Sequence, residues 1–175
     1  MADIPDGLVL KHHRDLEGLR ESLWPRRLLV ALVVLFAVLG LANVFGQRPT
    51  TAVASAPAAE LKVYAPEHLR SGLLFSARFH VYARHNLKDA FLILDPGWAE
   101  GLAINTIEPS PVGEASSDGR LSLELGHIAS GSSYILFMQF QINPTTVAWR
   151  RSADVTLTDG STPIVRIHRH YTIYP

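Results

Sequence analysis

The sequence predicts an all-β fold, a single antiparallel β-sandwich, preceded by one N-terminal transmembrane α-helix. Residues 28–46 form a run of nineteen residues without a charged side chain. From about residue 60 to the C-terminus, apolar and polar side chains alternate with a period of two, which is typical of half-buried strands. Turn-forming pairs interrupt this alternation at intervals of roughly 7 to 16 residues, as expected for a small all-β domain.

These features divide the chain into four parts. Residues 1–27 are expected to be a cytoplasmic tail, too short to bury a core of its own. Residues 28–46 are the expected transmembrane helix, and 47–59 the expected linker, because QRPTTAVASAPAA has the Ala, Pro, Ser and Thr content of a linker. Residues 60–175 are then an extracytoplasmic β-sandwich domain, long enough for one core.

The apolar run has the length of a single membrane span. At about 1.5 Å per residue it reaches roughly 28 Å, close to the hydrocarbon thickness of a bilayer. A lone span must pair all its backbone polar groups internally, so it must be a helix. Near its C-terminal end, Ala42 and Gly46 form a small-residue pair beside the polar Asn43. The preferred interpretation of Asn43 is a side chain that reaches interfacial water. The alternative is that Ala42, Asn43 and Gly46 pack against a neighbouring helix.

A cleaved signal peptide is the alternative to an uncleaved signal anchor. Small residues at 52–58 offer cleavage sites. However, the apolar core is longer than that of a signal peptide, and a long segment precedes it. We therefore expect the helix to be retained.

The basic residues that flank the span predict its orientation. Only Arg48 occurs between the span and Lys62. The excess of basic residues before the span predicts a single-pass protein of the cell (inner or plasma) membrane. Its N-terminus lies in the cytoplasm and its C-terminal domain outside, in the periplasm or the extracellular space. The preceding basic residues are Lys11, Arg14, Arg20, Arg26 and Arg27.

Five segments of the outer domain carry the strand pattern. Residues 75–84 alternate apolar and polar side chains, and 134–142 begin as a continuous apolar run, as expected for a central strand. Residues 90–94 are a short apolar run that ends at Asp-Pro-Gly. Residues 121–125 and 165–173 also alternate. With the turn signals between them, these segments predict seven or eight short antiparallel strands.

Two stretches resemble hallmarks of bacterial cell-surface immunoglobulin-like modules. Residues 86–96 (NLKDAFLILDP) are similar to the strand that follows a polar turn and ends at a proline in those modules. Residues 125–136 (LGHIASGSSYIL) are similar to the turn that leads into their long central strand. The resemblance covers about residues 60–175, and it implies an immunoglobulin-like sandwich with an adhesive or accessory role. It implies no functional residues.

Composition excludes several classes of function. Residues 60–175 carry ten Lys and Arg against eleven Asp and Glu, so the domain lacks the basic field of a nucleic-acid-binding protein. The chain has no cysteine, which excludes disulfides, thiolate metal sites and cysteine nucleophiles. An exported domain without disulfides fits a bacterial envelope better than a eukaryotic lumen.

Three histidines form the candidate ligand site. His168 and His170 lie two residues apart on an expected strand, so both should project from the same face, together with Arg166 and Thr172. With His80 from another strand they could bind zinc or copper. The neighbouring arginines would repel a cation, so the preferred interpretation is a solvated sheet face, with neither metal nor cofactor bound.

Aromatic and basic residues form the candidate interaction surface. Trp98 follows the Asp-Pro-Gly turn, where it either plugs the end of the sandwich or anchors a partner. Trp149 precedes Arg150 and Arg151, and an arginine can stack on that indole ring. These four residues are the expected contacts with a partner.

The sequence therefore predicts a non-catalytic, membrane-anchored interaction or accessory module. The motifs G-x-S-x-G, H-E-x-x-H, G-x-G-x-x-G and the P-loop are absent from the sequence, so we expect no enzyme. The expected partners are the lipid bilayer and another membrane or envelope protein, as in a subunit of a membrane complex, and not nucleic acid. The alternative is a ligand- or metal-binding envelope sandwich that uses surface histidines.

Overall fold

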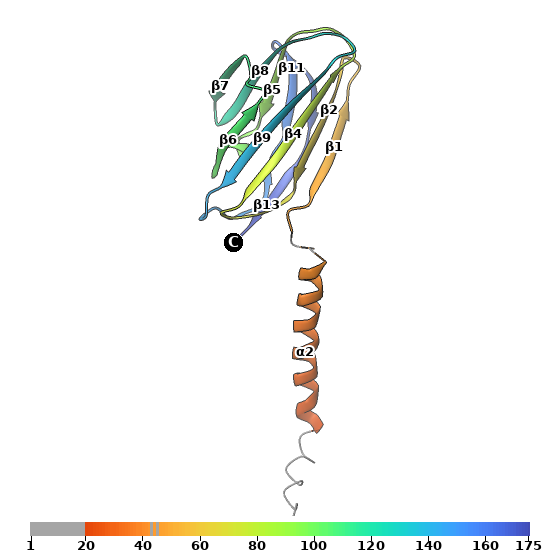
Figure 1. Ribbon diagram of the computed structural model, residues 1–175, viewed down its shortest axis with the longest axis vertical. Helices are drawn as coiled ribbons and strands as arrows, with labels where there is room; N and C mark the ends of the chain where they lie inside the picture. Colours follow the sequence, from red (N-terminus) through yellow and green to blue (C-terminus); the bar gives the residue numbers. More distant parts are fainter. Residues whose placement is uncertain (1–19, 43, 45) are drawn as a thin grey trace, which may run out of the picture. The chain divides into compact units, whose positions relative to one another are not determined.

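The computed structural model describes residues 20–42, 44 and 46–175 (Figure 1). Most of the expected tail, residues 1–19, lies outside the described residues, as does Asn43. The chain divides after residue 45 into a helical unit and a β unit.

One helix of the N-terminal unit is long and apolar enough to span a membrane. Helix α2 runs from Arg20 to Leu41, and its segment Leu23–Leu41 has a mean hydropathy of 1.9. The candidate span therefore begins and ends about five residues earlier than 28–46. The amide of Ala42 still donates to Val38 O at the helix end, whereas Gly46 lies in a bend beyond it. Ala42 and Gly46 are thus not a small-residue pair on one helix face.

The expected linker is wrong for residues 49–55, which form strand β1 (Pro49–Ser55). This strand pairs antiparallel with β2 (Ala59–Pro66), in a register that places Val53 opposite Lys62. Ala52 and Ala54 pack against the core from alternate positions. Because the inward residues of β1 are small alanines, its alternation of buried and exposed positions is not evident in the sequence. The composition of this segment therefore resembled that of a linker.

β1 and β2 belong to the first of two five-stranded sheets, with strand order β1-β2-β4-β9-β6. Its other strands are β4 (Leu74–Ala83), β9 (Ser133–Ile142) and β6 (Leu102–Glu108). All neighbours in this sheet are antiparallel. The strands expected at 75–84 and 134–142 are confirmed as β4 and β9.

The second five-stranded sheet has the order β12-β11-β5-β8-β7, and all its neighbours are antiparallel. Its strands are β12 (Thr162–Ile167), β11 (Val155–Asp159), β5 (Leu87–Leu94), β8 (Arg120–Ile128) and β7 (Gly113–Ser117).

A small sheet with the order β10-β13-β3 completes the domain. It contains β10 (Ala148–Ser152), β13 (His170–Tyr174) and β3 (His68–Arg70), and β13 runs parallel to β3.

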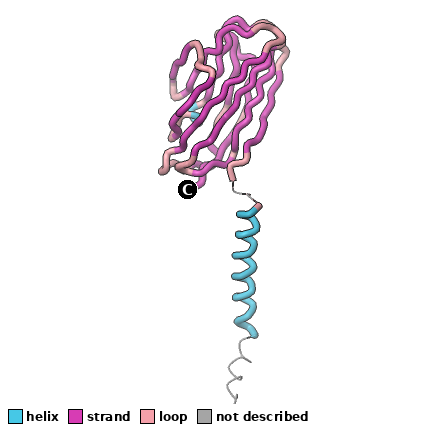
Figure 2. The backbone as a smooth tube through the Cα atoms, in the orientation of Figure 1, coloured by secondary structure: helices cyan, strands magenta, loops and turns pink. Residues whose placement is uncertain are grey.

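Strands make up most of the β unit (Figure 2). Buried apolar side chains from all three sheets form one core. In β4 every second residue is buried, as the alternation of its sequence requires. The largest core residue is Trp98, in the short 3₁₀ helix η3 (Pro96–Trp98) that follows β5. Its ring packs against Phe79, Phe140 and Tyr171 at centroid distances of 5.4, 5.4 and 6.1 Å.

Candidate functional site

The C-terminal strand pattern breaks at His168 and Arg169, which connect β12 to β13. β12 pairs with β11 in the second five-stranded sheet, whereas β13 pairs with β10 and β3 in the small sheet. The chain therefore changes sheets at these two residues. The expectation that His168 and His170 share one face of a continuous strand is wrong. Apolar residues keep the same alternation before and after Arg169, at positions 165, 167, 171 and 173, so the sequence does not indicate that the strand breaks at His168 and Arg169.

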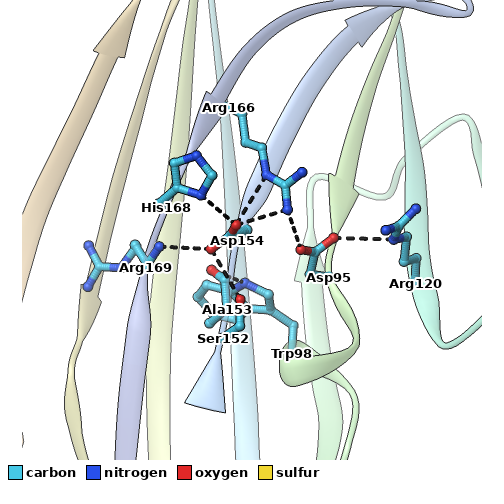
Figure 3. Close-up of polar contacts among 9 residues, drawn as sticks. All are labelled: Asp95, Trp98, Arg120, Ser152, Ala153, Asp154, Arg166, His168 and Arg169. Carbon is cyan, nitrogen blue, oxygen red and sulfur yellow. Dashed lines mark hydrogen bonds and ion pairs between the residues drawn. The ribbon is translucent and has the colours of Figure 1, made fainter. Parts of the chain in front are cut away.

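The buried carboxylate of Asp154 holds this connection in place (Figure 3). Asp154 is 5% exposed and lies between β10 and β11. It accepts hydrogen bonds from Arg166 Nη2 at 2.9 Å, from His168 Nδ1 at 2.7 Å and from the backbone amide of Arg169 at 3.1 Å. Burial alone would raise the pKa of Asp154. The hydrogen bonds from His168, the Arg169 amide and Arg166 outweigh it, so the pKa lies below the usual aspartate value.

A chain of ion pairs extends from Asp154 across the surface. Arg166 Nη2 also lies 2.9 Å from Asp95 Oδ2, and Arg120 Nε lies 3.3 Å from Asp95 Oδ1. The Arg166 side chain is 46% exposed and that of Arg120 is more exposed still. Each outer pair is therefore worth at most about 1 kcal/mol. The network joins β5, β8, β11 and β12, and its central acceptor is the buried carboxylate of Asp154.

A histidine that is hydrogen-bonded to a buried carboxylate is also the arrangement found in catalytic general bases. Among the described residues, no Ser, Thr or Tyr hydroxyl hydrogen-bonds His168, and its side chain is 71% exposed. The contacts show that the carboxylate of Asp154 holds the segment between β10 and β11 to the connection between β12 and β13.

The side chain of Arg169 extends away from Asp154 and into the protein (Figure 3). It is buried, and it donates to Ala65 O at 2.7 Å, to Thr50 Oγ1 at 3.0 Å and to Val63 O at 3.3 Å. Burial lowers the pKa of Arg169, and Glu67, 3.6 Å away, acts in the opposite direction. Arg169 thus attaches β1 and β2 to the start of β13, and it is not part of a solvated sheet face.

A surface hollow of about 320 Å³ lies beside this connection. Three of its lining residues are histidines, and we call it the histidine hollow. It contains His168 and His170, but the third histidine is His68 of β3 and not His80. The complete lining is Glu67, His68, Arg150, His168, Arg169, His170 and Thr172.

The expected grouping of His80 with His168 and His170 is therefore not found. His80 lines a different hollow, on the first five-stranded sheet, with Lys62, Tyr64 and Arg78. Within the described part of the chain, no group of three or more His, Cys, Asp and Glu residues has the geometry of a metal site. The sequence carried no signal for His68, because β3 has only three residues and meets β13 from about a hundred positions away.

Trp98 is not an exposed anchor for a partner. Its side chain is 2% exposed, and its Nε1 donates to Ala153 O at 2.9 Å. Of the two interpretations of this residue, the structure agrees with a plug at the end of the sheets. The turn before Trp98 directs its indole ring inward. In this turn, Gly97 lies close to the backbone of Ser152.

Among the described residues of the β unit, Trp149 is more exposed than the other exposed aromatic residues, Tyr64 and Tyr82. It is 77% exposed, in a β-bulge where the pairing of β10 with β13 shifts between Ala148 and Arg151. Arg150, the other bulge residue, has a φ of 48°, in the left-handed region that non-glycine residues rarely adopt. Arg150 is exposed, whereas Arg151 is half-buried and donates to Glu100 O. The expected surface is therefore reduced to Trp149 and Arg150.

Comparison with solved structures gives distant likenesses, including the following two. No family model and no curated protein matches the sequence. AvmM, described as catalysing macrocyclization in alchivemycin A biosynthesis, aligns at 5% identity over 74% of this chain and 90% of its own, with a TM-score of 0.44. A GH20 exo-β-N-acetylglucosaminidase from Vibrio harveyi aligns at 13% identity over 73% of this chain but 18% of its own, with a TM-score of 0.26. These scores carry no argument about activity, so the described residues alone support the functional conclusion.

Proposed function

We propose that this protein is a non-catalytic, membrane-anchored interaction module of a bacterial envelope, acting as an accessory subunit of a membrane protein complex. The observation that carries the proposal is the exposure of Trp149 on the bulge of β10. Tryptophan is enriched among the residues that dominate binding energy, and arginine is the second such residue present at the bulge.

The energetic argument concerns the apolar surface that Trp149 exposes. A tryptophan side chain that is 77% exposed has on the order of 150–200 Å² left to bury. At about 25 cal/mol per Å² this surface could contribute roughly 4 kcal/mol to an association. The neighbouring Val147 is also exposed and would enlarge the apolar contact. Arg150 would provide the polar rim that such contacts have.

The anchor in this proposal is α2, retained as an uncleaved signal anchor with its N-terminus in the cytoplasm. Strand β1 supports retention, because a cut within residues 52–58 would remove most of a strand that pairs with β2 along its whole length. It would also remove Thr50, whose hydroxyl accepts from Arg169. The excess of basic residues before the span supports the orientation.

The proposed class of the outer domain is an immunoglobulin-like sandwich. Two five-stranded antiparallel sheets that share one core support it, together with the resemblance of residues 86–96 and 125–136 to cell-surface modules. Such domains commonly present recognition surfaces without catalysis. The proposed partners are the lipid bilayer and a second envelope protein.

The test is site-specific photo-crosslinking in the full-length chain. A photoreactive residue replaces Trp149, and in a matched control it replaces Val112, which is 72% exposed on another part of the domain. We expect one defined protein adduct from position 149 and none from position 112. In parallel, Trp149→Ala should reduce recovery of that partner about tenfold or more while the β-sheet circular dichroism is unchanged. Equal crosslinking from both positions, or unchanged recovery, would contradict the proposal.

A further inference from the structure

The histidine hollow gathers cationic groups without a matching set of anions. Its one acidic residue is Glu67, whose carboxylate already accepts from Thr50 Oγ1 at 2.8 Å and lies 3.6 Å from the buried Arg169. Arg150 also lines the hollow, and within the described residues its guanidinium forms no ion pair. The guanidinium groups of Arg150 and Arg169 outnumber the single carboxylate of Glu67, so the hollow has excess positive charge.

The lining also offers hydrogen-bond donors that suit an oxyanion. The Arg150 guanidinium is a planar fork that matches two oxygens of one phosphate group. The imidazole N–H groups and the Thr172 hydroxyl add further donors to the same hollow. The backbone of Arg150 is held in the left-handed region by the bulge and by a hydrogen bond from its amide to Thr172 Oγ1 at 3.4 Å. Strain of this kind is frequent at ligand sites.

We propose that the histidine hollow is a binding site for a phosphate-type oxyanion, either free in solution or carried by a lipid headgroup. The same features argue against a cation, because Arg150 and Arg169 line the hollow and a metal-ligand geometry is not found among the described residues. This inference does not rest on the proposed interaction at Trp149, which is not part of the lining.

Contacts within the hollow decide which histidine nitrogens are available to a ligand. His168 faces Asp154 and Arg166 on its Nδ1 side, so its Nε2 is the nitrogen left for a ligand. His68 stacks on Tyr174, whose hydroxyl lies 3.4 Å from His68 Nδ1. The other charged groups that line the hollow are Glu67, Arg150 and Arg169.

The experiment uses the full chain in zwitterionic nanodiscs, with ¹³C-labelled histidine and inorganic phosphate as the probe at constant ionic strength. We expect saturable imidazole shifts for His68, His168 and His170, and none for His80. Arg150→Gly keeps the left-handed backbone accessible and should weaken binding about tenfold. Arg78→Gln, in the other histidine-containing hollow, is the matched control and should leave binding unchanged.

A second arm separates the two sources of the oxyanion. Nanodiscs that contain phosphatidylglycerol should reproduce the shifts without added phosphate if a lipid headgroup is the ligand, and should leave them unchanged if the ligand is free phosphate. The absence of saturation in both arms, equal shifts with chloride, or wild-type binding by Arg150→Gly would overturn the proposal. Trp149→Ala should retain phosphate binding, so a failure of the interaction function is distinguishable from a failure of this site.

Discussion

Replacing Asp154 tests whether one buried carboxylate fastens the connection between β12 and β13. In Asp154→Ala the buried amide of Arg169 loses its acceptor, which costs about 1–3 kcal/mol. The lost bonds from Arg166 and His168 add at most about 1 kcal/mol each, because both side chains are substantially exposed. We therefore expect a loss of about 1–5 kcal/mol in the free energy of unfolding. Asp154→Asn retains an acceptor oxygen and should lose about 1–2 kcal/mol.

The pH dependence of stability gives the same variants a second readout. The pKa of Asp154 is lower in the folded protein than in the unfolded chain, so the unfolded chain binds the proton more readily. The stabilising contribution is complete above the unfolded value of about 3.9 and is lost as the pH falls through the folded value. Wild-type stability should therefore decrease on acidification below about pH 5, and Asp154→Asn should lack that part of the decrease.

The assay is urea unfolding of the full chain in a mild detergent, followed by near-ultraviolet circular dichroism of the buried Trp98. The measurement is made at pH 7 and repeated down to pH 3. Asp118→Asn is the control, because Asp118 is an exposed turn residue with a φ of 53° that asparagine also tolerates. A loss below about 0.5 kcal/mol for Asp154→Ala, or a loss as large for the control, would refute the reasoning.

Two further predictions concern the turn after β5 and the N-terminal helix. A β-carbon at Gly97 would lie 1.9 Å from the carbonyl oxygen of Ser152, so Gly97→Ala should lose about 3 kcal/mol or more of stability, and an unchanged melting temperature would contradict the geometry. If α2 is retained, full-length protein should stay in the membrane fraction after alkaline extraction, and a periplasmic reporter fused after Pro175 should be active. A soluble species that begins near Ala56, or a reporter active only in the cytoplasm, would exclude the proposed anchor.

The sequence predicted best the strands that place large apolar residues at alternate positions. β4 and β9 follow directly from their alternation, because Phe, Val, Leu and Met dominate their buried faces. β1 was missed because its inward residues are Ala52 and Ala54, which are small enough to resemble a linker. β3 was missed because three residues carry no period, and its partner β13 is distant in sequence.

The candidate site was harder to predict because its residues meet only through tertiary structure. Trp149 and Arg150 were identified from composition, but their bulge was not. The burial of Arg169 was not predicted, since a charged residue is rarely buried unless it is paired. Backbone carbonyl oxygens of β1 and β2 accept the hydrogen bonds of Arg169. Every residue has such an oxygen, so the sequence does not indicate which of them a buried arginine will contact.

The hydrogen bonds of Arg169 also determine when, during synthesis of the chain, the β domain can complete its folding. Its partners Thr50 and Ala65 are made more than a hundred residues earlier, and β13 pairs in parallel with β3, which also precedes it by about a hundred residues. A chain cut before Arg169 therefore has neither the hydrogen bonds of Arg169 nor strand β13. The first two strands of the domain then wait for residues 169–174 before this attachment can form.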